Sequence, residues 1–145
     1  MHEYKCTILR VVDGDTVDIN IDLGFGIWMH KERIRLFGID TPESRTRDLE
    51  EKKFGLMAKE MVKKLIPEGS SQTLVTQKDK SGKYGRILGQ FKITFEDKET
   101  TLNEWMVKYH YGVEYYGQSK DDIAEEHLRN RELVNEDMAK LFNMH

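Results

Sequence analysis

Two acidic side chains stand close together in the stretch FGIDTPES, residues 37–44. Asp40 and Glu43 follow an apolar run and are separated by Thr41 and Pro42. Proline fixes its own φ and favours an extended conformation in the residue before it, so the two carboxylates are held at a defined separation. Carboxylate oxygens bind hard divalent cations, and a deprotonated carboxylate can activate water. The stretch is therefore a candidate site for metal-assisted hydrolysis.

Three further groups, each at a predicted strand end or in a loop, extend the same chemistry. They are Asp15 in DGDT (13–16), Arg35 in RIRLFGIDTPE (33–43) and Arg86 in KYGR (83–86). Asp15, Asp40 and a backbone carbonyl supply oxygen ligands for a divalent cation, Glu43 supplies a base, and the two guanidiniums suit bidentate phosphate binding. Phosphodiester hydrolysis needs neutralised phosphate oxygens, an activated water and a stabilised leaving oxygen, so the set indicates a phosphodiesterase.

A structural interpretation of the same residues is also open. The two arginines can pair with Asp40 and Glu43 in an ion-pair cluster that carries no catalysis. His110 and His127 are interpreted as structural, because a single histidine near a helix face more often packs than reacts. A calcium titration separates the interpretations, since a structural cluster is expected to bind no metal.

Hydrophobic periodicity predicts the elements that position these groups. Three strands are expected first, then a helix, two more strands and two helices, at 4–12, 16–24, 28–39, 54–65, 71–77, 86–95, 102–109 and 121–142. Short strands without regular strand–helix alternation suit a small β-barrel better than a doubly wound sheet. We therefore expect an α+β, mainly β fold: a five-stranded barrel with a helix after the third strand and two C-terminal helices.

Length and composition limit the class of protein. The 145 residues, 38% of them apolar, predict a single domain over 1–145. No stretch approaches the ~20 apolar residues of a membrane span, and the N-terminus resembles no export signal. We therefore expect a cytoplasmic protein without a membrane partner, with export by another route left open. Cys6 is the single cysteine, which excludes an intramolecular disulfide and a cysteine metal cluster.

The net charge of −3 is unevenly distributed along the chain. Residues 28–92 carry 15 basic and 9 acidic side chains, whereas the segments on either side are acidic. A local basic surplus favours a polyanion at one face, and a solvated lysine-rich helix near 52–64 explains it equally well.

Several motifs stand in the order found in staphylococcal nuclease and its homologues. They are VVDGDTV (11–17), RIRLFGIDTPE (33–43), DKSGKYGRILG (79–89) and EEHLRNRE (125–132). GIDTPE followed further along by KYGR is a specific signature, and the chain resembles this family over nearly its whole length. The resemblance implies an OB-fold barrel and a calcium-dependent nuclease of DNA or RNA, which breaks the 5′-side P–O bond and leaves 3′-phosphate ends.

The resemblance also implies the residues that hold the metal and activate water. Asp15 and Asp40 would bind Ca²⁺ together with the backbone carbonyl of Thr41. Glu43 would act as general base or would orient the attacking water. In this interpretation the two acids around Pro42 have separate tasks, one as a ligand and one as a base.

The remaining residues of the resemblance contact the substrate, which we expect to be single-stranded or locally opened DNA or RNA bound by a monomer. Arg35 and Arg86 would clamp the phosphate and stabilise the transition state. The nucleotide pocket would be lined by Lys83, Tyr84 and Tyr116, because aromatic rings pack on sugars and bases.

A second hypothesis is a non-catalytic OB-fold module that only binds nucleic acid or protein, since this barrel serves many functions. The presence of all the metal acids and phosphate arginines favours the enzyme. The chain departs from the family in two places: the stretch DLGFGIWMHKE (22–32) is longer and richer in aromatic and glycine residues, and GQSKDD follows Tyr116.

Overall fold

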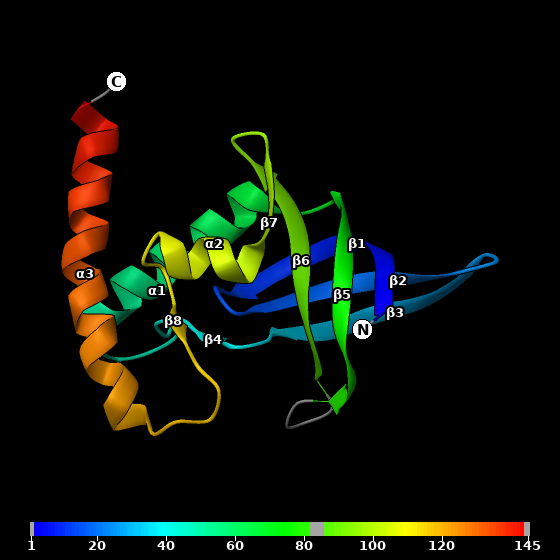
Figure 1. Cartoon of the computed structure of the whole chain (residues 1–145), viewed down its shortest axis with the longest axis horizontal. Helices are drawn as coiled ribbons and strands as arrows, with labels where there is room; N and C mark the ends of the chain where they lie inside the picture. The colour runs from blue at the N-terminus through cyan, green and yellow to red at the C-terminus, as the bar shows by residue number, and fades with distance from the viewer. Residues whose placement is uncertain (1, 82–85, 144–145) are drawn as a thin grey trace.

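A computed structural model places a β-barrel beside three helices, which gather at one end of the molecule (Figure 1). The structure describes residues 2–81 and 86–143. Strands outweigh helices in this part of the chain, which confirms the predicted α+β, mainly β class.

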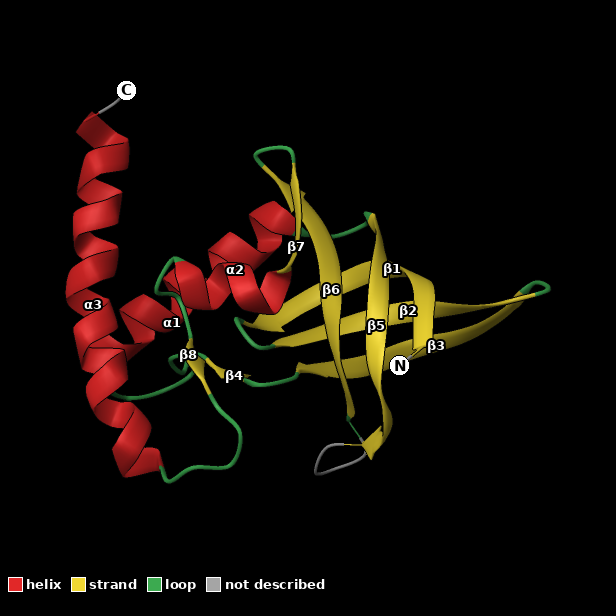
Figure 2. Ribbon diagram, viewed as in Figure 1, coloured by secondary structure: helices red, strands yellow, loops and turns green. Residues whose placement is uncertain are grey.

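Five strands form the barrel, and the first three of them form a meander (Figure 2). They are β1 (His2–Asp13), β2 (Thr16–Gly24), β3 (Ile27–Leu36), β5 (Ser71–Ser81) and β6 (Ile87–Phe95). Antiparallel pairs join β3 to β2, β2 to β1, β1 to β5 and β5 to β6, and a parallel pairing of β3 with β6 closes the ring. Val17, Ile19 and Ile21 alternate with more exposed residues on β2 and are buried in the core. The predicted five-stranded OB-fold barrel is confirmed.

Helix α1 (Leu49–Leu65) follows the third barrel strand, as expected, but it begins five residues earlier than its hydrophobic pattern predicts. The carboxylate of Asp48 accepts hydrogen bonds from the backbone N–H groups of Glu50 and Glu51, which caps the helix at that point. The first turn is exposed, so it carries no apolar signal. The predicted start at Phe54 is therefore wrong.

Helices α2 (Leu102–Lys108) and α3 (Lys120–Asn143) are the two expected C-terminal helices. The hydroxyl of Thr101 accepts a hydrogen bond from the backbone N–H of Glu104, and that of Ser119 accepts one from Asp122. Both hydroxyls occupy the N-cap positions that the sequence indicated. Helix α3 lies at the end of the molecule opposite the tip of the β2–β3 hairpin (Figure 1).

Three short strands were not predicted: β4 (Ile39–Asp40), β7 (Lys98–Thr101) and β8 (Val113–Glu114). The strand predicted for 28–39 ends at Leu36, because Gly38 turns the chain with a φ of +76°. Beyond this turn β4 pairs with β8, so Asp40 lies opposite Val113. This pairing brings the acidic stretch next to the segment that leads into α3.

Two other features differ from the expected pattern. Strand β5 continues to Ser81, although residues 78–81 were expected in a turn. The β2–β3 hairpin projects beyond the barrel, and Phe25 at its tip is fully exposed (Figure 1). None of the helices in the described residues is long and apolar enough to cross a membrane.

Candidate active site

Three charged side chains from the barrel and the strand that follows it meet at one place. Asp15 lies in the turn between β1 and β2, Arg35 lies near the end of β3, and Asp40 lies on β4. The backbone N–H of Leu36 donates to the carbonyl oxygen of Asp15 at 2.8 Å, and Thr16 pairs with Arg35. The register of β2 and β3 therefore fixes Arg35 beside Asp15.

The guanidinium of Arg35 contacts both carboxylates. Its Nη2 atom lies 3.5 Å from Oδ2 of Asp15 and 3.8 Å from Oδ1 of Asp40. Its Nη1 atom donates a hydrogen bond of 2.9 Å to the carbonyl oxygen of Leu36. The three charged side chains are only 14–16% exposed, so water screens their interactions weakly. One guanidinium thus brings two carboxylates together in a partly desolvated site.

Asp15 also connects the barrel to the loop after β4. Its Oδ2 atom accepts a hydrogen bond of 3.2 Å from the backbone N–H of Thr41, and its Oδ1 atom accepts one of 3.0 Å from the hydroxyl of Thr16. The Thr41 side chain is buried, and its hydroxyl has no hydrogen-bond partner within the described residues. Asp15 therefore sets the position of the segment that carries Thr41 and Glu43.

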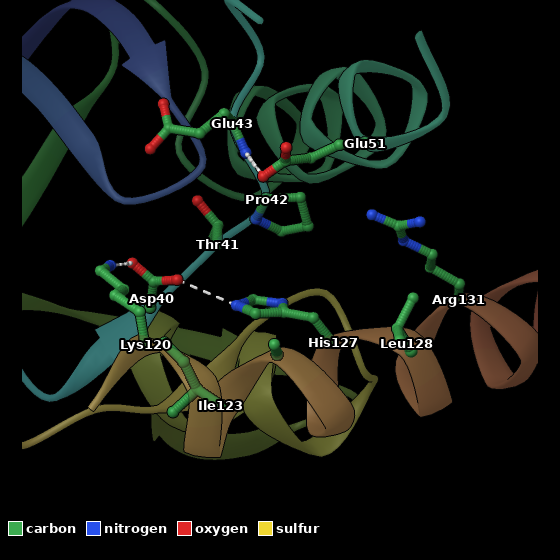
Figure 3. Close-up of a pocket in the computed structure, with 11 residues that line it drawn as sticks. Asp40, Thr41, Pro42, Glu43, Glu51, Lys120, Ile123, His127, Leu128 and Arg131 are labelled. Atoms are coloured by element: carbon green, nitrogen blue, oxygen red, sulfur yellow. Dashed lines mark hydrogen bonds and ion pairs between the residues drawn. The ribbon is translucent and has the colours of Figure 1, made fainter. Parts of the chain in front are cut away.

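Helix α3 supplies two cationic or protonatable groups to Asp40 (Figure 3). Nζ of Lys120 lies 3.2 Å from Oδ1, and Nε2 of His127 lies 2.9 Å from Oδ2. Burial alone raises the pKa of Asp40, but the hydrogen bond from His127 and the charge of Lys120 outweigh it and lower the pKa below its ordinary value. Asp40 is therefore held in its ionised form.

Glu43 has the opposite electrostatic surroundings. Partial burial and then repulsion by nearby carboxylates raise its pKa above the ordinary value. The carboxylates responsible are, in order, those of Asp15, Asp13, Asp40 and Glu51. The next residue is anchored, because the hydroxyl of Ser44 donates to the carboxylate of Asp13. Glu43 is an exposed carboxylate with a raised affinity for a proton, which suits a general base.

A pocket of about 420 Å³ opens beside these groups, between the loop after β4 and the face of α3 (Figure 3). One wall holds Asp40, Thr41, Pro42, Glu43 and Glu51. The other wall is α3, with Lys120, Ile123, Ala124, His127, Leu128 and Arg131. The pocket therefore joins the acidic stretch to a helix that lies 80 residues further along the chain.

The structure brings five of the residues singled out in the sequence into one region: Asp15, Arg35, Asp40, Thr41 and Glu43. Arg86 immediately precedes β6, whose parallel pairing with β3 runs alongside Arg35. Tyr116 is 70% exposed and packs edge-on against Phe37, with 5.9 Å between ring centroids. Lys83 and Tyr84 lie outside the described residues.

The sequence interpretation missed the contribution of α3. His127 was interpreted as structural and Lys120 was not singled out, yet both contact Asp40. Residues 120, 124, 127 and 131 recur at helical spacing, so they share one face of α3 and line the pocket together. That spacing of Lys120, His127 and Arg131 is the signal that would have found them. A structural ion-pair cluster without catalysis would also contain the contact of Arg35 with Asp40, so this contact does not distinguish the two interpretations.

The donor chemistry of the site fits a hard divalent cation. Two carboxylate oxygens, from Asp15 and Asp40, converge on the same nitrogen of Arg35, and Thr41 adds a buried hydroxyl without a partner among the described residues. Among the side chains that the structure describes, those of residues 2–77 and 86–134, three or more His, Cys, Asp or Glu do not gather in a metal-holding group. A cation here would therefore also need backbone oxygens and water.

Comparison with known protein families identifies the family to which the chain belongs. Residues 33–140 match the family described as staphylococcal nuclease homologue. The chain belongs to this family. The match includes four of the clustered residues, Arg35, Asp40, Thr41 and Glu43, together with Arg86. Asp15 precedes the matched region of the chain, and its place in the site rests on its contacts with Arg35 and Thr41.

Three similar proteins come from Bacillus species. An uncharacterized protein of Bacillus anthracis is 35% identical over 117 residues, which cover 80% of this chain and 50% of the relative. Endonuclease YhcR of Bacillus subtilis is 27% identical over 119 residues, 79% of this chain and 9% of the relative. The SPbeta prophage-derived endonuclease YokF of the same organism is 29% identical over 124 residues, 82% of this chain and 40% of the relative. The chain thus spans half the length or less of these relatives.

Proposed function

We propose that this chain is a calcium-dependent nuclease that hydrolyses phosphodiester bonds of DNA or RNA, breaking the 5′-side P–O bond and leaving 3′-phosphate ends. The observation that carries the proposal is the convergence of the Asp15 and Asp40 carboxylates on Arg35, beside the exposed carboxylate of Glu43. Membership of the staphylococcal nuclease homologue family and two similar proteins named endonucleases support nuclease chemistry.

Arg35 would bind the phosphate that is cleaved. Its Nη1 atom is held by the carbonyl oxygen of Leu36, so the direction of the guanidinium is set before substrate arrives. A fixed guanidinium next to a phosphate stabilises the charge that grows on the oxygens in the transition state. Arg86, which precedes the strand paired with β3, would supply the second guanidinium.

Glu43 would take the proton of the attacking water. As the water oxygen bonds to phosphorus, its proton passes to the Glu43 carboxylate, the bond from phosphorus to the 5′ oxygen breaks, and the leaving oxygen takes a proton from solvent. The raised pKa of Glu43 makes its carboxylate a stronger proton acceptor than an ordinary glutamate. The products are a 3′-phosphate and a 5′-hydroxyl.

Asp15, Asp40 and the carbonyl of Thr41 would hold Ca²⁺, which when bound would neutralise charge on the phosphate oxygens. The lowered pKa of Asp40 keeps this ligand ionised. Lys120 and His127 contact the same carboxylate, so the ion would compete with them for its oxygens. Calcium is favoured over magnesium because one of the ligands is a backbone carbonyl oxygen, a donor that is typical of calcium sites.

The substrate strand would be single or locally opened, and the protein would act as a monomer. The ring of Tyr116 is largely exposed and is held against Phe37, so it offers a surface on which a base or sugar packs. Lys83 and Tyr84, which the family resemblance implies as further contacts, belong to the same proposal.

A second candidate function is a non-catalytic module that binds nucleic acid or protein. One observation favours it: both oxygens of Asp40 already contact groups of α3, as they would in a purely structural ion-pair cluster. In that case the charged groups stabilise the junction between β4 and α3, and no metal is needed.

A cleavage assay separates the two functions. Fluorescently labelled single strands of DNA and RNA are incubated with the protein in calcium, in magnesium and in a chelator. The nuclease proposal expects cleavage in calcium and none in chelator, with Asp15→Asn slower by about two orders of magnitude or more. Asp18→Asn is the matched control, because Asp18 lies three residues further along, on β2, and pairs with Arg33 outside the site.

Two results would reject the nuclease proposal. One is the absence of cleavage in every condition while the oligonucleotide still binds, which leaves the binding module. The other is cleavage by Asp15→Asn at the wild-type rate with an unchanged calcium requirement, which moves the metal away from Asp15. Circular dichroism of each variant establishes that the barrel is folded.

A further inference from the structure

Asp40, Thr41 and Glu43 line the pocket between the loop after β4 and α3, but the proposed reaction gives the cavity itself no role. Its volume of about 420 Å³ falls within the range of roughly 300–1,000 Å³ that is typical of ligand sites. We propose that this pocket is a subsite for the base of the nucleotide that neighbours the cleaved phosphate, on the side away from Tyr116. The inference rests on the proposed nuclease function and adds a second nucleotide contact to it.

The position of the pocket follows from the path of the chain around Asp40. On one side, the N–H of Tyr115 donates to the carbonyl of Gly38, and the adjoining Tyr116 packs on Phe37. Lys120 contacts Asp40 itself, and α3 then runs past Pro42. A strand whose phosphate is bound by Arg35, next to Asp40, thus has an aromatic ring towards Gly38 and the pocket towards Pro42.

The walls of the pocket match the shape of a base better than that of a phosphate. Pro42, Ile123, Ala124 and Leu128 provide apolar surface on both sides. The acids of the pocket, Asp40, Glu43 and Glu51, outnumber its cations, Lys120 and Arg131. Lys120 is already paired with Asp40, so the remaining acids would repel a phosphate that entered the pocket. A nucleobase is uncharged and flat, so it gains contact with apolar walls without that repulsion.

Polar groups are also available for the edge of a base. The guanidinium of Arg131 lies over the ring of Phe54, 5.5 Å from its centroid, and its Nε atom is buried without a hydrogen-bond partner within the described residues. Guanidinium groups donate to ring nitrogens and carbonyl oxygens of bases, and carboxylates such as Glu51 accept from their amino groups. A donor and an acceptor therefore border the apolar part of the pocket.

The test fills the pocket without touching the proposed catalytic residues. Ala124→Trp places a large ring in the pocket from an exposed position of α3. Glu125→Trp is the matched control, because the neighbouring residue is equally exposed and does not line the pocket. The substrates are short single strands in which one phosphodiester remains and the other linkages are methylphosphonates. An abasic residue replaces the nucleotide on one or the other side of the bond.

For the wild-type protein, kcat/KM is expected to fall about tenfold when the base on the pocket side of the cleaved bond is missing, because the contact of one base contributes that much to binding. Ala124→Trp is expected to show a KM about tenfold higher for the intact strand and no further loss for that abasic strand. Its response to the abasic residue on the other side stays as in wild type. Glu125→Trp behaves as wild type with all substrates.

The proposal is overturned if folded Ala124→Trp keeps the wild-type KM and the wild-type response to both abasic strands. Should Ala124→Trp fail to fold, Leu128→Ser, at another exposed position lining the pocket, is held to the same criterion. Failure of the nuclease function itself gives a different pattern, namely no cleavage of any strand. Fluorescence anisotropy in chelator then tests the subsite by binding alone. The subsite is supported if wild type binds one abasic strand more weakly than the intact strand and the pocket variants do not. It is refuted if wild type binds the intact and abasic strands equally well.

Discussion

Gly55 provides a sensitive test of how α1 positions Glu43. The residue is buried on α1 where the helix passes the backbone of the loop after β4. A methyl group at this position would lie 2.7 Å from the backbone nitrogen of Ser44 and closer still to the carbonyl group of Glu43. Real side chains do not approach backbone atoms to less than 3.0 Å, so Gly55→Ala must move the loop or the helix by more than 0.3 Å.

The two expected effects on the free energy of unfolding have opposite signs. Alanine is favoured over glycine in a helix interior by about 1 kcal/mol. Overpacking against atoms that cannot rotate away costs about 1–3 kcal/mol, and here the obstructing atoms are backbone. We therefore expect the free energy of unfolding to fall by up to about 2 kcal/mol, which lowers Tm by up to ~6 °C.

The same displacement should slow the proposed reaction. A misplacement of about 1 Å costs about 10²-fold in rate, so a shift of several tenths of an ångström at Glu43 is expected to lower kcat about tenfold with little change in KM. Thermal melts and steady-state cleavage kinetics measure the two effects. Leu56→Ala is the control, because it changes the adjacent, exposed residue of the same helix. A Gly55→Ala protein that melts higher than wild type and cleaves at the wild-type rate would refute the reasoning.

Three further predictions follow from the burial and charge of single residues. Glu43→Gln should raise the free energy of unfolding at pH 7, because it removes a carboxylate whose pKa is raised in the folded state by partial burial and then by repulsion from nearby acids. The gain should vanish as pH falls below the ordinary glutamate pKa, and an equal or lower stability at pH 7 would contradict the prediction. His127→Ala should lower stability by about 1.5–3 kcal/mol at pH 7. The hydrogen bond from His127 stabilises the fold only while Asp40 is ionised, so the loss of stability measured by denaturant titration should shrink as pH falls through the lowered pKa of Asp40. A loss that does not change with pH would contradict this prediction. Burial raises the pKa of Cys6 to about 11, so its thiol should react with a thiol reagent only at the rate of unfolding, and rapid labelling of the folded protein would argue against this burial.

The barrel strands could be predicted because each has a local signal. Alternation of Val17, Ile19 and Ile21 with polar residues identifies β2, and Asp13-Gly14 marks the turn before it. The parallel contact of β3 with β6 has no such signal, since it joins segments far apart in the sequence. The start of α1 was missed for a related reason: its first turn is exposed, and the cap on Asp48 is local polar chemistry without a hydrophobic period.

The residues of the site also fall into those that have a local sequence signal and those that do not. Asp15 and Arg35 lie in short motifs next to barrel strands whose pairing is predictable, so their contact follows from the barrel. Asp40 and Glu43 follow β3 within a few residues, but the β4–β8 pairing that places Asp40 has no local signal. The contacts of Asp40 with α3 depend on the direction in which the last helix leaves β8, which no short stretch of sequence specifies. His127 was therefore interpreted as a packing residue, although its Nε2–H donates a hydrogen bond to the ionised carboxylate of Asp40.

The most direct test of the proposed mechanism is single-turnover cleavage of a labelled DNA strand in calcium by wild type and Glu43→Gln. Glu60→Gln serves as the control, because Glu60 is an exposed acid of α1 that pairs with Lys63 away from the site. We expect cleavage by wild type and by the control, with fragments that end in 3′-phosphates, and a rate about 10²-fold or more lower for Glu43→Gln. Equal single-turnover rates for folded Glu43→Gln and wild type would contradict the assignment of Glu43 as the group that activates water.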